Sequence, residues 1–186
     1  MGTTRTPRAS WIEQGLRALA TGGPDAVRIE NLAQSLGVTK GGFYGYFRNR
    51  DALLTEMLDT WEYEVSDGII EQVDRAGGDA RARLERLFLL VAEAADGPVR
   101  GITADLAVRA WARHDAGVAE RLRRVDNRRM EYLRSLFSEF CTDTDEVEVR
   151  CLLAVTVRIG NHFHAADDGI RSRADVMATI RKRLLS

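Results

Sequence analysis

Two short apolar periodicities, separated by a single glycine, lie between Arg28 and Phe47 and constrain the fold more than any other part of the sequence. In the first, apolar residues recur at three- and four-residue spacing, which predicts one face of a two-turn helix. These residues are Ile29, Leu32, Ala33 and Leu36. Gly37 follows directly, and a residue without a Cβ can end a helix in a left-handed conformation at no steric cost. The stretch before Gly37 is therefore predicted to be a short helix with a defined end.

A second helix is predicted directly after this glycine. Thr39 is a good N-cap, because its hydroxyl can accept a hydrogen bond from the first amides of a following helix. Phe43 and Phe47 lie four residues apart and are expected to face inward as core residues, whereas Lys40 and Tyr44 lie on other faces. Two helices joined by a turn of three or four residues that contains glycine form a helix-turn-helix.

The residues around this turn resemble the N-terminal domain of the TetR family of bacterial transcriptional regulators. The similarity is carried by the segment L-A-x-x-L-G-V-T-K-G-G-F-Y-G-Y-F-R-N-R-D-A-L-L, and it extends from about Trp11 to Trp61. Its G-V-T-K-G-x-F-Y-x-x-F core is highly specific, whereas the rest of the chain matches the family only in length and helical pattern. Two positions depart from the pattern: Arg28 stands where Thr or Ser is frequent, and Gly42 stands where Ser is frequent.

The resemblance implies an all-α fold with two parts. Residues 1–50 are expected to form a three-helix helix-turn-helix head that binds DNA, and residues 51–186 a helical bundle for ligand binding and dimerisation. It also implies a homodimer, a double-stranded DNA operator with two half-sites, and a small-molecule pocket in the C-terminal domain. These last three expectations come from the resemblance and do not follow from periodicity.

Charge is distributed unevenly along the chain although its sum is near zero. The formal net charge is −1, yet residues 1–50 contain seven Lys and Arg against three Asp and Glu. The first part therefore has an excess of four positive charges and the remainder an excess of five negative charges. A small basic head attached to an acidic body suits binding to a polyanion such as DNA.

Residue types in the predicted second helix fit contacts with a DNA duplex. Lys40, near its start, can reach a guanine edge or a phosphate, and the hydroxyls of Thr39 and Tyr44 can donate to phosphates. Each glycine in a helix interior costs about 1 kcal/mol relative to alanine. The glycines here either let the helix backbone approach the duplex or avoid clashes in a tight corner. The predicted DNA-binding residues are Arg28, Thr39, Lys40, Gly41, Gly42, Tyr44, Tyr46, Arg48 and Arg50.

Apolar stripes continue along the rest of the chain and predict helices throughout. Asn49 is expected to cap a helix of about seven turns that continues to Val73 and joins the head to the body. A later helix, which Asp115 is expected to cap, has a run of arginines on its polar face. We interpret this run as a solvated face paired with nearby acidic residues. Its members are Arg121, Arg123, Arg124, Arg128 and Arg129.

The segment from Thr144 to about Ala165 is apolar on two faces, so we expect it to be covered on both. Similar proteins use their last two long helices to form a four-helix dimer bundle, and the two-sided pattern supports this arrangement here. The predicted dimerisation residues are Cys151, Leu152, Val155, Ile159, Phe163, Met177 and Ile180.

Several predicted helices of the body carry large apolar side chains. The resemblance implies that these side chains surround a cavity, and ligand pockets are mostly apolar with a few polar groups. We therefore expect a small, largely apolar or aromatic effector. Trp61 lies on the helix that leaves the head, so a ligand that contacts it would be coupled to the half-site spacing. The predicted ligand-binding residues are Trp61, Val65, Phe88, Asp105, Leu106, Arg109, Trp111, Phe137, Phe140, Asn161 and His162.

Motifs for catalysis and for cofactor binding are missing from the sequence. It contains no G-x-S-x-G segment, no Walker motif and no dinucleotide fingerprint. His162 and His164 are two residues apart on a predicted helix, so they point in different directions and cannot share a metal ion. We therefore expect no enzyme activity, no cofactor and no metal.

Cysteine usage and hydropathy indicate a cytoplasmic protein with no membrane partner. Cys141 and Cys151 fit no disulfide pattern, and no apolar run reaches the length of a membrane span. The chain is predicted to be a ligand-responsive repressor that a small molecule releases from its operator. Two alternatives stay open: an activator or partner-controlled regulator with the same head, and a helical ligand-binding protein that does not bind DNA. Whether either cysteine has a redox role also stays open.

Overall fold

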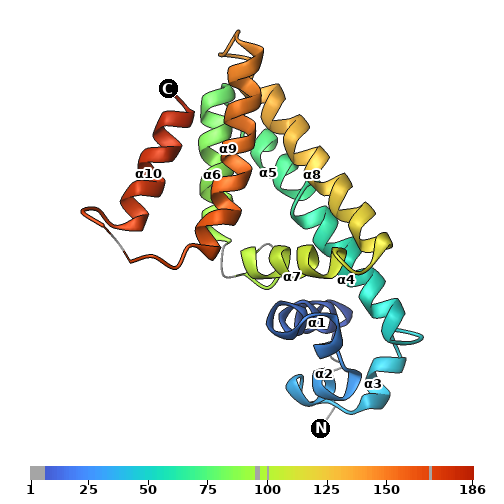
Figure 1. Cartoon of the computed structure of the whole chain (residues 1–186). Coiled ribbons are helices and arrows are strands. Elements are labelled where there is room, and N and C mark those ends of the chain that lie inside the picture. The colour runs from blue at the N-terminus through green and yellow to red at the C-terminus, as the bar shows by residue number, and fades with distance from the viewer. Residues whose placement is uncertain (1–6, 95–96, 100, 168) are drawn as a thin grey trace. The chain divides into compact units, whose positions relative to one another are not determined.

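The computed structural model describes residues 7–94, 97–99, 101–167 and 169–186, and within these ranges every regular element is a helix (Figure 1). The expected all-α class, a helix-turn-helix head followed by a helical region, is confirmed. No helix of the described ranges is long and apolar enough to cross a membrane. In chain order the elements are α1 (Arg8–Gly22), the 3-10 turn η1 (Pro24–Ala26), α2 (Ile29–Ser35), α3 (Lys40–Tyr44), α4 (Arg50–Glu64), α5 (Asp67–Ala76), α6 (Ala80–Glu93), α7 (Ile102–Ala112), α8 (Ala116–Phe137), α9 (Thr144–Phe163) and α10 (Arg173–Leu184).

The chain divides into two compact units. The first contains residues 1–66 and 94–125, and the second contains residues 67–93 and 126–186. These units do not follow the expected boundary after residue 50, because α4 and α7 both pack against α1. The expected division of function, with DNA binding before residue 51 and ligand binding and dimerisation after it, stays a prediction.

The core of the first unit is built on α1. Trp11 is fully buried and packs edge-on against Phe43 of α3, with ring centroids 5.4 Å apart. Gly15 is buried where α1 meets α4, and a Cβ placed there would lie 2.5 Å from the Met57 sulfur. The absence of a side chain at Gly15 therefore allows α1 and α4 to approach closely, which fixes the frame that supports α3.

The expected cap at Asn49 is confirmed, but the helix that it begins is shorter than predicted. The Asn49 side chain accepts a hydrogen bond from the Ala52 amide at 2.9 Å. α4 then ends at Glu64, and the predicted continuation to Val73 forms a separate helix, α5. The single long helix was therefore a wrong prediction.

The break between α4 and α5 lies at Ser66. The Ser66 hydroxyl donates to the Glu62 carbonyl, and its amide donates to the Tyr63 carbonyl at 3.2 Å. A serine that bonds to the backbone one turn earlier competes with the regular helix ladder. Asp67 follows in the first turn of α5, where the helix dipole favours a carboxylate. The apolar stripe continues through the break and does not reveal it.

The run of arginines on α8 pairs with acidic residues, as expected. Within the first unit, Arg121 donates to Asp59 at 2.6 Å and to Glu62 at 3.0 Å. Within the second, Arg128 donates to Asp67 at 2.8 Å. These guanidinium groups therefore stabilise contacts inside the protein and are not an open basic patch.

Candidate nucleic-acid interface

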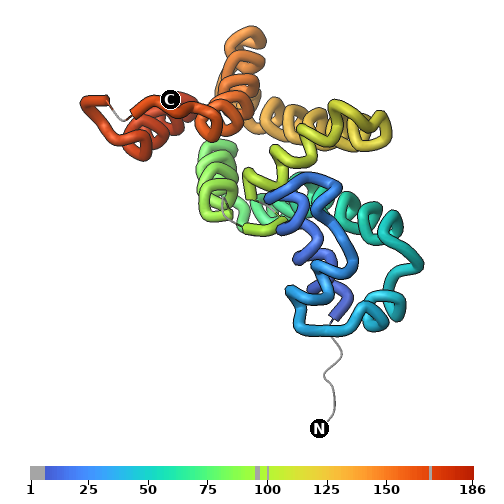
Figure 2. Tube along the Cα trace, turned by 60° about the horizontal axis from the view of Figure 1, so that its bottom comes forward, coloured from blue at the N-terminus to red at the C-terminus, as the bar shows by residue number. Residues whose placement is uncertain are grey.

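The turn between α2 and α3 is set by one left-handed residue. Gly37 has a φ of 66°, a conformation that an L side chain adopts at a steric cost. The chain then folds back, and the Val38 amide donates to the Ala33 carbonyl at 3.0 Å. Figure 2 follows the trace from α2 through this turn into α3. The predicted helix-turn-helix is therefore present, with its helix end at the predicted glycine.

Aromatic packing fixes which face of α3 is exposed. Phe43 and Phe47 are buried, and their rings stack with centroids 5.2 Å apart, as the four-residue spacing predicted. Tyr44, next to Phe43 in sequence, is 54% exposed. α3 thus directs its apolar side into the core and presents Lys40 and Tyr44 to solvent.

Lys40 is exposed but has an acidic neighbour on α2. Its ammonium group forms an ion pair with the Glu30 carboxylate. The hydrogen bond to Lys40 is the main cause that lowers the pKa of Glu30, and the same bond raises the pKa of Lys40. Both groups are therefore charged at neutral pH, and DNA would have to compete with Glu30 for the lysine.

The two glycines at the start of α3 are not needed to avoid clashes inside the chain. Among the described residues, a Cβ on Gly42 would meet no atom within 4 Å, and a Cβ on Gly41 would meet only the Thr39 hydroxyl, at 3.7 Å. Both residues are exposed. Of the two explanations left open by the sequence, the clash explanation therefore fails for these two positions, and close approach of a partner to the helix backbone stays as a prediction.

Three further predicted contacts have different surroundings. Thr39 occupies the N-cap position of α3 with extended backbone, but its side chain makes no capping hydrogen bond, so its hydroxyl is not held by the helix. Arg48 is exposed, whereas Tyr46 is half-buried and packs against the core of the first unit. Tyr46 can reach a partner only with the exposed part of its side chain.

The two arginines that flank the motif are held by backbone carbonyls. Arg50 donates from Nε to the Val27 carbonyl at 2.7 Å and from a terminal nitrogen to the Pro24 carbonyl. Arg28 donates to the Asp25 carbonyl at 3.2 Å and is otherwise exposed. The Arg50 guanidinium therefore joins the start of α4 to the loop before α2, and its predicted contact with DNA stays a prediction.

The predicted ligand-binding residues are divided between the cores of the two units. In the first unit, Trp61, Val65 and Trp111 belong to one apolar cluster. Asp105 is fully buried and accepts a hydrogen bond from Arg109 at 2.9 Å, and Leu106 is half-buried.

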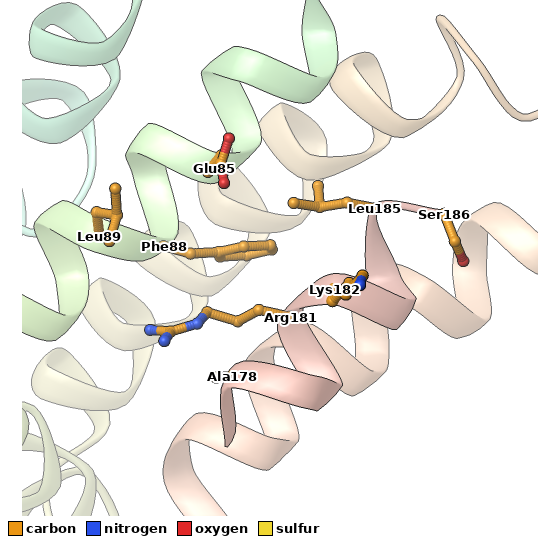
Figure 3. Close-up of a pocket in the computed structure, with 8 residues that line it drawn as sticks. All are labelled: Glu85, Phe88, Leu89, Ala178, Arg181, Lys182, Leu185 and Ser186. Atoms are coloured by element: carbon orange, nitrogen blue, oxygen red, sulfur yellow. The ribbon is translucent and has the colours of Figure 1, made fainter. Parts of the chain in front are cut away.

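In the second unit, Phe88, Phe137 and Phe140 share a cluster, while Asn161 is half-buried and His162 is exposed. A further apolar groove of about 620 Å³ lies between α6 and α10 (Figure 3). Of the predicted ligand-binding residues, this groove includes Phe88. Sequence reasoning did not find it, because helical spacing marks a face and does not say which other face it meets.

The predicted dimerisation residues differ in their exposure. Leu152 and Phe163 are 58% and 68% exposed. Val155, Ile159, Met177 and Ile180 are half-buried. Cys151 is fully buried in the core of its own unit, and burial raises the pKa of its thiol to about 11. Cys151 therefore stays a neutral thiol at physiological pH and packs inside its own chain.

The first unit thus contains a helix-turn-helix that is held by an aromatic core and exposes a lysine and a tyrosine. This is the form of a DNA-binding motif. Residues 12–57 match the family model described as "Bacterial regulatory proteins, tetR family". This match identifies residues 12–57 as a DNA-binding domain of the TetR family, a family of transcriptional regulators.

Solved structures share the fold over nearly the whole chain. A TetR-family regulator from Agrobacterium tumefaciens has 17% sequence identity and a TM-score of 0.67, with 97% of each chain covered. A ketosteroid transcriptional regulator of Mycobacterium tuberculosis has 16% identity and a TM-score of 0.65, covering 99% of this chain and 95% of that one. AibR, solved in complex with isovaleryl coenzyme A and operator DNA, has 13% identity and a TM-score of 0.63, with 95% of each chain covered. No curated protein sequence matches the chain.

Proposed function

We propose that this protein is a cytoplasmic, homodimeric repressor that a small molecule releases from its DNA operator. The observation that carries the DNA-binding half of this proposal is the exposed edge of α3, where Lys40 and Tyr44 flank two glycines that have open space around them. A lysine and hydroxyl groups contact phosphates and guanine edges, and an unobstructed backbone permits close approach to the duplex.

The proposed mechanism has two states. In one, the dimer holds its two α3 helices at the spacing of successive major grooves, about 34–36 Å. In the other, a bound effector displaces α4, which begins directly after the motif, and alters that spacing. The effector must bind the second state more tightly than the first, because otherwise the equilibrium does not shift.

The apolar face of α9 supports the dimer. Besides Leu152 and Phe163, Val149 and Leu153 are 50% and 44% exposed. These four residues recur at helical spacing, and a contiguous exposed apolar stripe commonly marks a protein–protein contact. A second copy of the chain, with α9 and α10 contributing to a four-helix bundle, is the proposed occupant.

The effector is proposed to be a small molecule with a large apolar part. Two proteins of the same fold support this class, since one is named for ketosteroids and the other was solved with isovaleryl coenzyme A. In this chain Trp61 is fully buried on α4, and its indole N–H has no hydrogen-bond partner in the described part of the chain. A ligand that reaches Trp61 would gain a donor and would act on the helix next to the motif.

Titration of the protein with aromatic and lipophilic compounds, followed by tryptophan fluorescence, tests the effector. The Trp61→Phe variant should lose most of the response, whereas Trp11→Phe, which alters the core below α3, should keep it. A response that is unchanged in Trp61→Phe would exclude contact at this position.

A mobility-shift assay on DNA upstream of the gene, with excess unspecific competitor, tests the function itself. The proposed repressor binds a discrete fragment and dissociates when the effector is added. A complex that persists with effector while transcription rises would support the activator. Absence of any specific complex would favour a ligand-binding protein without DNA binding.

A further inference from the structure

The groove between α6 and α10 is formed by one face of each helix. Glu85, Phe88 and Leu89 follow the three- and four-residue spacing of one face of α6. On the other side, the groove is lined by Ala178, Arg181, Lys182, Leu185 and Ser186. Its volume, about 620 Å³, lies within the usual range for small-molecule pockets.

The floor of the groove is apolar. Figure 3 shows the Phe88 ring projecting from α6 toward α10, with Leu185 on the far side. Phe88 and Leu185 are half-buried, and Leu89 is 49% exposed. A ligand lying here would remove apolar surface from water at three side chains, which favours binding of an alkyl or aryl group.

Two cations on α10, Arg181 and Lys182, border this floor. In the described part of the chain, the side chains of Arg181 and Lys182 make no hydrogen bond and no ion pair. Arginines elsewhere in the same unit are engaged: Arg134, for example, donates to Glu148 at 2.5 Å and 3.1 Å. Arg181 and Lys182 are therefore available to an anion at the edge of the groove.

The end of α10 is neutralised by other residues. Arg150 donates to the Leu184 carbonyl at 2.8 Å, and Arg81 donates to the Leu185 carbonyl at 2.9 Å. Cations at these carbonyls balance the negative end of the helix dipole. The same bonds attach α10 to α9 and α6, so the groove is held in shape, and Arg181 and Lys182 are not required for this role.

Glu85 makes the two edges of the groove opposite in charge. Figure 3 shows Glu85 and Arg181 on opposite sides of the Phe88 ring. A carboxylate at one edge repels an anion, and the two cations at the other edge attract it. A ligand with one anionic head and one apolar tail would therefore have a single favoured orientation, with its head on the α10 side.

We propose that this groove binds an amphipathic carboxylate, with its alkyl chain on Phe88 and Leu89 and its carboxylate at Arg181 and Lys182. The proposal goes beyond DNA binding, since it assigns a ligand site on the second unit. A role of this site in release from the operator rests on the proposed function.

Isothermal titration calorimetry of the full chain with decanoate tests the site in the absence of DNA. Arg181→Gln and Lys182→Gln should each weaken binding about tenfold, since a hydrogen bond to a charged group is lost. Arg183→Gln is the matched control, because Arg183 is exposed on the same helix and does not line the groove. Glu85→Gln should tighten binding, and decanol should bind more weakly than decanoate.

Three outcomes would overturn the proposal. Decanol binding as tightly as decanoate would remove the role of the cations, and equal weakening by all three α10 variants would indicate unspecific attraction. A change from dimer to monomer in Arg181→Gln, measured by sedimentation velocity, would mean that a second copy occupies the groove. Decanoate binding that leaves the operator complex intact would keep the site and reject only its role as an effector site.

Discussion

α3 and α9 each bury an apolar face, but their exposed faces differ: the exposed face of α3 is polar, and that of α9 is apolar. α3 directs Phe43 into the core and exposes Lys40 and Tyr44. α9 buries Val147 and Cys151 in its own unit and exposes an apolar stripe. The residues of this stripe are Val149, Leu152, Leu153 and Phe163.

This difference indicates two different partners. Lysine, hydroxyl groups and open glycine backbone are suited to a polyanion with a regular surface. An apolar stripe on a helix that is already packed on one side is suited to another protein surface. We infer that α3 and α9 serve DNA and a second protomer, respectively, and that the second contact sets the spacing required by the first.

The largest effect is expected from charges on α9. Leu152→Glu combined with Leu153→Glu should dissociate the dimer, because an unpaired buried charge in an interface is destabilising by about 3–5 kcal/mol. Both side chains are more than two-fifths exposed in the single chain, at 58% and 44%, so the variant should keep its helical circular dichroism. Sedimentation velocity measures the dimer and an anisotropy assay measures operator binding. The dimer and the operator affinity should be lost together.

Leu89→Glu is the matched control for this variant, since Leu89 is 49% exposed and lies on α6. It should leave the dimer intact. If the variant with both charges on α9 is still a dimer, the interface lies elsewhere and α9 is not the dimerisation surface.

A smaller effect is expected from Lys40→Ala. Loss of a base contact should weaken operator binding by about 1–3 kcal/mol and relax sequence preference at that position. The side chain is half-exposed and pairs only with Glu30 in the described part of the chain, so stability should be nearly unchanged. Fluorescence anisotropy measures the change against Arg17→Ala, whose side chain is similarly exposed on α1. Equal affinities for both variants would contradict the assignment of α3 as the recognition helix.

Gly42→Ala should change stability and operator affinity in opposite directions. Its Cβ would meet no atom of the described residues within 4 Å, so the free energy of unfolding should rise by up to about 1 kcal/mol through helix propensity. Operator affinity should nevertheless fall if the backbone of α3 approaches the duplex. Thermal unfolding and anisotropy measure the two effects. A variant that gains stability and keeps full affinity would show that the open space at Gly42 is not used by DNA.

The smallest effect is expected from Glu30→Gln, and its sign is opposite. Removing the carboxylate frees Lys40 and eliminates a negative charge from the face of α2, so DNA binding should tighten by about two- to five-fold at low salt. Glu13→Gln, which changes an exposed acid on α1, is the control. Affinity that is unchanged or weaker at every salt concentration would show that Glu30 does not compete with DNA for Lys40.

Much of the fold followed from local patterns. The three- and four-residue spacing on both sides of Gly37, together with the Phe43 and Phe47 pair, predicted the helix-turn-helix. The match of residues 12–57 to the family model agrees with this prediction. The cap at Asn49 was also predicted correctly. Each of these features depends on residues within a few turns of one another.

The break at Ser66 was not predicted, because the apolar stripe continues across it. The spacing of Trp61, Val65 and Ile69 is equally compatible with one helix or two. The serine hydroxyl, which bonds to the Glu62 carbonyl, and Asp67 at the start of α5 decided the outcome. A side chain that competes with the backbone for hydrogen bonds leaves little signal in a hydropathy pattern.

The sequence by itself determined most of the helices, their buried faces and the family of the N-terminal domain, because helical periodicity and turn chemistry are local properties. Only the tertiary structure decided that Arg50 binds the carbonyls of Pro24 and Val27, and that α6 and α10 face each other across a groove. Both depend on segments that are distant in sequence. A side chain's charge is fixed by its type, but its partner is fixed by packing, and packing decides whether that charge is used inside the chain or remains available to a ligand.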